Sequence, residues 1–135
     1  MLKEKRILKE AEKEIEKEMN KKGYIDDSDN TDRFLDELIE NLSNEDEELK
    51  KFLLEKIEEI MYKKYNKIGS MNERGDYAGC WYKDKKHAVL WAGFWQENSI
   101  FEAYEEFIEA FGEYIDITLE EFAEAYEVNL EDFAD

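Results

Sequence analysis

The clearest chemical pattern in the sequence is formed by glutamates spaced three or four residues apart near the C-terminus. Two rows occur: Glu102, Glu105, Glu106, Glu109 and Glu113, and then Glu120, Glu124, Glu127 and Glu131. In a helix, which rises 1.5 Å per residue, this spacing places carboxylates about 4.5–6 Å apart. That separation approximates the phosphate spacing along a nucleic-acid strand. The second row requires helical geometry to continue through Val128 and Asn129.

No cation accompanies these glutamates in the sequence. Lys86 is the last basic residue, so the final 49 residues carry 14 acidic and no basic side chains. Amphipathic helices usually interleave opposite charges at i and i+4, because like charges at that spacing are destabilising. The rows are either a solvated outer face or a surface for a basic partner, and the uncompensated repulsion is a reason to expect the partner.

Two further groups contain residue types that catalysis requires. Asp76, Asp84 and Lys86 superficially resemble the active-site hairpin of PD-(D/E)xK nucleases, where two carboxylates hold a metal and a lysine steadies the attacking water. Asp84, however, falls in a predicted turn, and no basic surface surrounds it. Cys80 and His87 are the single Cys and His of the chain and could form a thiolate and base pair. No third group that would orient the histidine is identifiable, so we expect no enzyme.

Residues 26–37 partly match a calcium-binding loop. Oxygen ligands stand at loop positions 1, 3 and 5, and Glu37 stands at position 12. Thr31 replaces the glycine of the sharp turn, and Arg33 replaces the apolar anchor, so a helix-capping turn is the preferred interpretation. We therefore expect neither a metal nor a cofactor.

An aromatic run extends through the middle of the chain. Its members are Tyr77, Trp81, Tyr82, Trp91, Phe94 and Trp95. A base-stacking platform would need surrounding cations to hold the nucleic-acid backbone. The run is therefore expected to be core, with one or two residues, Trp95 among them, exposed as anchors for a protein partner.

Overall charge limits the class of partner. The 37 acidic and 19 basic residues of this 135-residue chain give a net charge of −18. By segment, the net charge is +2 over 1–22, −10 over 26–48, +4 over 49–86 and −14 over 87–135. Nucleic acid and anionic membranes are therefore poor direct partners.

The chain contains no sign of export. No apolar stretch approaches the roughly 20 residues of a membrane span, and the N-terminus lacks the apolar core of a secretory signal. One cysteine excludes an intrachain disulfide. These features predict a cytoplasmic protein.

Hydrophobic periodicity and turn signals then indicate the elements that position these residues. Apolar spacing predicts helices over 2–20, 31–42 and 44–65, the last with Asn44 as N-cap. A loop is expected over 66–76, followed by a β-hairpin of 77–82 and 87–95. Ser99, Thr118 and Asn129 each precede an acidic residue by three positions, which predicts three further helix starts.

The predicted fold is therefore α+β and predominantly helical. N-terminal helices are followed by a β-hairpin that two or three short acidic helices cover. We expect a helical region over 1–68, a linker over 69–76 and an acidic region over 77–135. Whether the acidic region forms one compact domain with 24–68 is left open.

The leading functional hypothesis is a small acidic inhibitor that occupies a basic, nucleic-acid-binding surface of another protein. By composition and size the acidic half resembles the nucleic-acid mimics that phages use as anti-restriction or anti-CRISPR proteins, and it is similar to immunity proteins that neutralise nuclease toxins. The resemblance implies carboxylates that stand in for phosphates. The alternative is a non-enzymatic interaction module, in which the N-terminal helices pair with a partner helix or form a homodimer.

Overall fold

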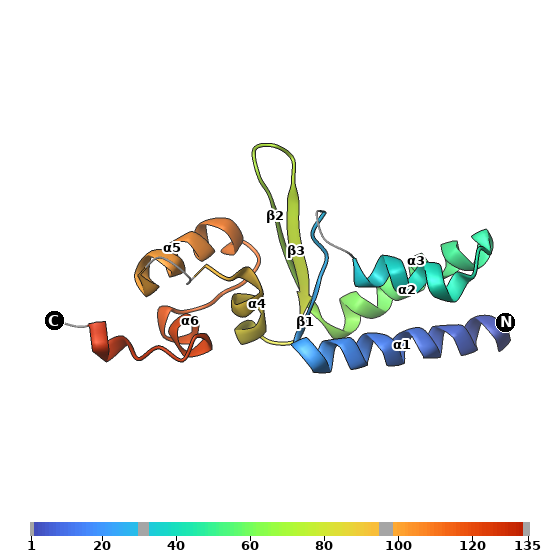
Figure 1. The fold of residues 1–135 in the computed structure, drawn as a ribbon, viewed down its shortest axis with the longest axis horizontal. Coiled ribbons are helices and arrows are strands. Elements are labelled where there is room, and N and C mark those ends of the chain that lie inside the picture. The colour runs from blue at the N-terminus through green and yellow to red at the C-terminus, as the bar shows by residue number, and fades with distance from the viewer. Residues whose placement is uncertain (1, 30–32, 95–98, 134–135) are drawn as a thin grey trace.

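The computed structural model describes residues 2–29, 33–94 and 99–133. These residues form six α-helices, three strands and a short 3₁₀-helix (Figure 1). The elements are α1 (Leu2–Lys22), β1 (Tyr24–Asp26), α2 (Phe34–Ser43), α3 (Glu47–Lys64), β2 (Asn66–Met71), β3 (Tyr77–Tyr82), α4 (Lys85–Ala92), α5 (Ile100–Phe111), α6 (Leu119–Ala125) and η1 (Leu130–Phe133). The predicted α+β, mainly helical class is confirmed. Within the described ranges, no helix combines the length and apolarity that crossing a bilayer requires.

The three strands form one antiparallel sheet in the order β1-β3-β2. Ile25 of β1 is paired with Trp81, and Ile68 of β2 is paired with Cys80. The turn between β2 and β3 is closed by Asn72, whose side-chain oxygen accepts hydrogen bonds from the backbone N–H groups of Arg74 and Asp76. Because β3 pairs with both β1 and β2, it is the central strand of the sheet.

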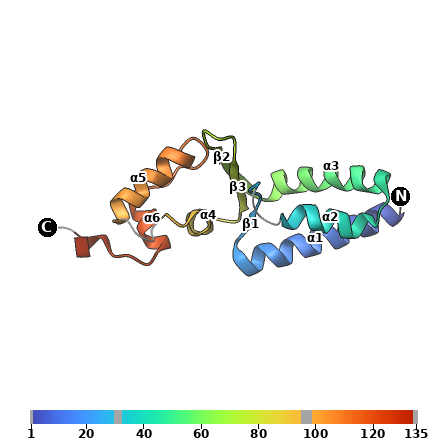
Figure 2. The same ribbon diagram turned by 45° about the horizontal axis from the view of Figure 1, so that its top comes forward.

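The sheet separates two hydrophobic cores because successive side chains of a strand point to opposite faces. Trp81 and Ile25 pack with α1, α2 and α3 in one core. Cys80, Tyr82 and Ile68 pack with α4, α5 and α6 in the other. Figures 1 and 2 show these two helical groups on opposite sides of the sheet. β3 thus contributes side chains to both cores.

The prediction that residues 87–95 form the second strand of a hairpin is wrong. Residues 87–95 were expected to pair with 77–82, but Lys85–Ala92 is helix α4. Its N-cap is Asp84, whose carboxylate accepts a hydrogen bond from the His87 backbone N–H at 3.0 Å, and it ends at Gly93 with φ 65°. The other strand of the β3 hairpin is instead β2, so residues 66–71 of the expected loop are strand, and the predicted linker begins inside this strand. The division into two regions stays a prediction.

Other expected helix boundaries are partly confirmed. α1 buries Ala11, Ile15 and Met19, as its narrow stripe predicts. Asn44 is wrong as an N-cap: it ends α2 in the left-handed region, and Asp46 caps α3 by accepting hydrogen bonds from two backbone N–H groups. The predicted caps Ser99 and Thr118 are confirmed, and their hydroxyls accept from backbone N–H groups three residues on.

A substitution at Gly23 tests the junction between α1 and α4. Gly23 has φ 81°, and an added Cβ would lie 2.0 Å from Cδ2 of His87, whose ring Asp84 holds. Left-handed backbone costs a non-glycine residue about 1–2 kcal/mol. Gly75→Ala is the matched control, since Gly75 has φ 85° and open space around it. We expect Gly23→Ala to lower the free energy of unfolding in urea by more than Gly75→Ala. Equal losses would contradict a tight contact at this junction.

A second substitution tests the Asp84 cap. Burial would raise the pKa of Asp84, but hydrogen bonds from the backbone and ring of His87 outweigh it and hold that pKa below its usual value. Removing an N-cap costs about 1 kcal/mol, so Asp84→Ala should lose about that much at neutral pH. Because the folded pKa is depressed, the stabilisation is present above about pH 4, the unfolded value, and is lost as the pH falls through the folded one.

Unfolding of wild type and Asp84→Ala should be compared between pH 7 and pH 3 by urea titration. The exposed Asp116, which lies between α5 and α6, is the control for removing an acidic side chain. A stability gap that stays constant, or widens, towards low pH would contradict the role of the ionised cap.

Candidate functional site

The α5 helix carries the first glutamate row on the face opposite its core. Ile100, Ala103, Phe107 and Phe111 are all buried, whereas every glutamate of the row is exposed. Glu102, Glu105, Glu106 and Glu109 lie on α5 itself, and Glu113 lies in the turn that follows. The predicted placement of this row on the outer face of a helix is therefore confirmed up to Glu109.

Several of these carboxylates have no ion-pair partner in the part of the chain that the structure describes. Glu102, Glu105 and Glu109 form no ion pair with any residue in the described ranges. The ion pairs found there join other residues, and Glu121, paired with Lys85, is the one acidic residue of the last 49 that takes part in them. Carboxylates at i and i+4 repel each other across a single helical turn. α5 therefore presents uncompensated negative charge to solvent.

The second row is broken. The helical continuation through Val128 and Asn129 that this row requires is not found, because α6 ends at Ala125 and Glu127 adopts left-handed backbone with φ 59°. Glu120 and Glu124 lie on α6, Glu127 lies after its end, and Glu131 lies in η1. Asn129 begins this 3₁₀-helix by accepting a hydrogen bond from the Glu131 backbone N–H at 3.0 Å. All four carboxylates are exposed, but they do not form one helical row.

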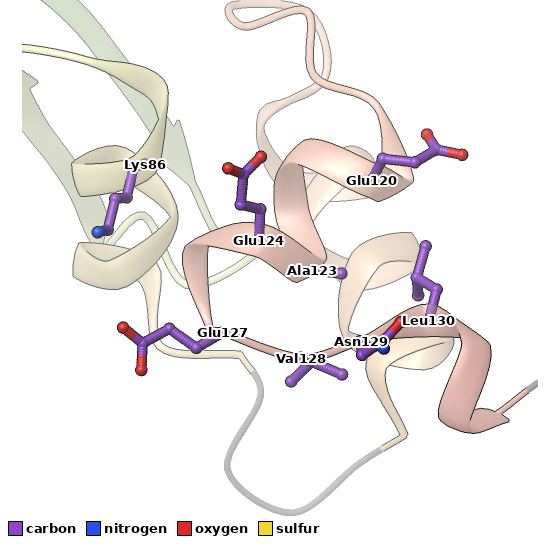
Figure 3. A pocket seen from close by; sticks show the side chains of 8 residues that line it. All are labelled: Lys86, Glu120, Ala123, Glu124, Glu127, Val128, Asn129 and Leu130. Carbon is purple, nitrogen blue, oxygen red and sulfur yellow. The ribbon is translucent and has the colours of Figure 1, made fainter.

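Three of them instead border an open hollow of about 610 Å³ (Figure 3). Glu120, Glu124 and Glu127 surround it, and Ala123, Val128, Asn129 and Leu130 complete the α6 side. Figure 3 places Lys86 beside it on the neighbouring α4. The hollow therefore combines carboxylates, short apolar side chains and one ammonium group.

The fold supplies cations that sequence reasoning missed. Lys86 borders the hollow, and Lys85 forms an ion pair with Glu121 at 3.7 Å. Both lysines precede the cation-free segment, so only the packing of α4 against α6 brings them to it. No local pattern in the sequence indicates this approach. The positive charge of these two lysines therefore offsets part of the negative charge on α6, whereas the α5 carboxylates named above have no such ion pair in the described residues.

Aromatic packing fixes the acidic helices in place. Phe107 of α5 and Phe122 of α6 are fully buried, with ring centroids 5.6 Å apart. The Tyr104 hydroxyl donates to the Ile117 carbonyl at 2.8 Å, and the Tyr126 hydroxyl donates to the Val89 carbonyl at 3.0 Å. These contacts tie α5 to the segment before α6, and the end of α6 to α4.

Exposed apolar side chains accompany the α5 charges. Phe101 is 41% exposed, and Tyr114 is 56% exposed. Phe101 precedes Glu105 by one helical turn, so it adjoins the acidic face. Trp95, the anchor expected from the sequence, lies outside the described residues. In the rest of the aromatic run, Trp81 and Tyr82 are buried, and Tyr77, Trp91 and Phe94 are half-buried.

The structure does not assemble the nuclease-like group. Asp76 lies in the turn before β3, and Asp84 caps α4 after it. The six residues of β3 and Lys83 separate them, which at about 3.3 Å per residue places them on the order of 20 Å apart. A shared metal between these carboxylates is therefore excluded by distance.

The surroundings of Cys80 also disfavour the thiolate and base pair. Cys80 is fully buried in the α4–α6 core, and burial raises the pKa of its thiol far above the ordinary value. The His87 ring is held by Asp84, with 2.6 Å between Nδ1 and Oδ1. A thiol in this environment stays protonated, and only the thiolate is nucleophilic.

The calcium-like segment uses its described side chains for local structure. Asp26 accepts a hydrogen bond from the Ser28 backbone N–H at 2.8 Å, and Asp29 accepts one from the Tyr77 backbone N–H at 3.1 Å and forms an ion pair with Arg33. Residues 30–32 of this loop lie outside the described residues. Among those that are described, no group of three or more His, Cys, Asp or Glu side chains could hold a metal ion.

Neutralising one pair of α5 carboxylates tests their repulsion. Glu105→Gln/Glu109→Gln removes a like-charge i, i+4 pair and should raise the free energy of unfolding by about 0.2–0.5 kcal/mol at low salt. The gain should shrink as salt is added, because exposed charges are screened. Urea unfolding at two salt concentrations measures both effects.

Glu121→Gln is the control for the loss of a carboxylate. Glu121 accepts hydrogen bonds from the Thr118 backbone and hydroxyl and also pairs with Lys85. Its replacement should therefore lower stability. Destabilisation by the Glu105/Glu109 change would show that these charges already have favourable partners within the chain.

No family model matches the sequence, and no curated protein or solved structure is significantly similar to it. The function of the chain can therefore be inferred only from its own residues and their geometry.

Proposed function

We propose that this chain is a non-enzymatic acidic protein that binds a basic, nucleic-acid-binding surface of another protein through α5 and the α6 hollow. One observation carries the proposal: Glu102, Glu105 and Glu109 are exposed on a helix whose opposite face is buried, and none of them pairs with a cation in the described residues. Carboxylates held in this way can occupy positions that phosphates fill on the partner.

The energetics favour a partner over simple solvation. A magnitude of about 2–8 in net charge suffices for the solubility of a small domain, and this chain carries −18. The excess destabilises the folded protein through self-repulsion. A basic partner would relieve that repulsion, and opposite charges would also accelerate association. We infer an inhibitor of the partner's nucleic-acid binding, as phage anti-defence proteins or nuclease immunity proteins are, acting in the cytoplasm.

Phe101 and the hollow beside α6 add apolar contact area to the charged surface. An aromatic side chain next to glutamates can contact the aliphatic part of an arginine or lysine while the carboxylates meet its charged end. The apolar side chains of Ala123, Val128 and Leu130 offer the same combination in the hollow. Both features favour side chains of a protein partner over free cations.

The alternative function is pairing of the N-terminal helices with a partner helix or a second copy, and the apolar stripe of α1 no longer supports it. The stripe Ala11, Ile15 and Met19 is almost completely buried in the core that α1 shares with α2 and α3. Homo-oligomerisation would therefore require another surface on these helices.

A charge-reversal variant tests the proposed surface. Glu105, Glu109, Glu120 and Glu124 are replaced together by Lys, and four exposed glutamates on the other side of the sheet, Glu10, Glu14, Glu48 and Glu55, serve as a control with the same charge change. Immobilised wild type should capture nucleic-acid-binding proteins from lysate at low salt. It should release them at about 0.5 M salt, where the screening length is roughly 4 Å.

The α5–α6 variant should lose these partners, whereas the control variant should retain most of them. Duplex DNA or RNA added to the captured complex should compete for the partner. Retention of the same partners by a folded α5–α6 variant would refute the proposal, as would capture that nucleic acid does not disturb.

A further inference from the structure

A second surface lies between α2 and α3, on the other side of the sheet from the acidic helices. Here the two helices and the sheet border a groove of about 190 Å³. Leu35 and Ile39 line it from α2, and Leu54 and Met61 line it from α3, with the Trp81 side chain at the sheet. Leu54 is 44% exposed although it belongs to this apolar lining. The groove therefore presents apolar surface from two adjacent helices.

The size of the groove limits its occupant. Small-molecule sites usually measure about 300–1,000 Å³ and enclose most of their ligand. A smaller, open groove between two helices suits one large apolar side chain at a time. Partner helices are bound in this way, with apolar residues at i, i+3, i+4 and i+7 entering a groove.

Charge around the groove limits the occupant further. Lys67 is the basic residue of its lining, and its ammonium group lies 3.0 Å from the Asp27 carboxylate and 4.8 Å from the centroid of the Trp81 ring. Lys67 is thus already neutralised within the chain. Asp36 of α2, whose carboxylate lies 3.8 Å from the Arg33 guanidinium, and Glu58 of α3 also line the groove. The rim is therefore negative overall, which disfavours acidic peptides and phosphates.

We propose that this groove docks a basic amphipathic helix of a partner protein, which inserts one large apolar side chain beside Leu54 and places lysine or arginine near Asp36 and Glu58. A second copy of this chain is a poor occupant, because it would bring together two molecules of charge −18. The proposal uses α2, α3 and β3 and does not depend on the function proposed for α5 and α6.

A peptide-binding experiment on the full chain tests this docking. The probe is a fluorescein-labelled helical peptide of leucine and lysine, with leucines at the i, i+3, i+4, i+7 spacing, and binding is measured by anisotropy. Leu54→Ala should weaken binding at least about tenfold, because it removes buried apolar surface from the complex. Leu90→Ala is the matched control, since Leu90 is 39% exposed on α4 and lies outside the groove. It should leave the affinity unchanged.

Two further comparisons separate docking in the groove from attraction to the acidic helices. A peptide with glutamate in place of lysine should bind at least about tenfold more weakly, and the Glu105/Glu109/Glu120/Glu124→Lys variant should still bind the lysine peptide and remain sensitive to Leu54→Ala. Equal affinity of wild type and Leu54→Ala, equal binding of the two peptides, or no saturable binding of the lysine peptide would each overturn the proposal. None of these results bears on partner capture through α5 and α6.

Discussion

The rest of the structure depends on the burial of β3 on both faces. Cys80 and Tyr82 enter one hydrophobic core and Trp81 enters the other, so apolar layers must cover the strand from two sides. The chain meets this requirement by placing α1–α3 before the hairpin and α4–α6 after it. Trp81 is further held by the Tyr62 ring at 4.8 Å between centroids and by the ammonium group of Lys67. A single six-residue strand thus joins an N-terminal half of mixed charge to a C-terminal half whose basic residues are confined to the lysines around the start of α4.

Sequence patterns predicted the elements whose signals are local. α5 and α6 have a strong apolar face and a capping residue, and both were found where the pattern placed them. α4 was missed because its run from His87 to Trp91 is short and mostly apolar, and periodicity cannot separate such a run from a buried strand. β2 was missed for the opposite reason: Ile68 is its one fully buried residue, with Gly69 and Ser70 beside it, and its strand conformation comes from pairing with β3.

For the candidate site, the sequence predicted which glutamates are exposed but not where α6 ends or which residues of other helices lie beside it. Alternation with a buried face was enough to place Glu105 and Glu109 outward on α5. The end of α6 was not predictable from its glutamates, because Glu127 leaves the helix through a left-handed conformation that the glutamate spacing does not indicate. The approach of Lys86 to the acidic hollow depends on tertiary packing between residues almost forty positions apart. A count of charges along the chain therefore overstates how far α6 lies from basic residues, whereas it describes the absence of ion pairs at Glu105 and Glu109 of α5 correctly for the described residues.

The acidic surface is held by groups that do not share its charge. Phe107 and Phe122 are fully buried and pack with their rings tilted at 52° to each other, and the hydroxyls of Tyr104 and Tyr126 anchor α5 and α6 to backbone carbonyls. Repulsion between exposed glutamates is small for each pair, whereas burial of one aromatic side chain contributes about 1.5–3 kcal/mol. The scaffold can therefore keep the carboxylates in fixed positions despite their mutual repulsion. A surface already ordered before contact loses little conformational entropy on binding, so most of the electrostatic attraction to a basic partner remains available as affinity.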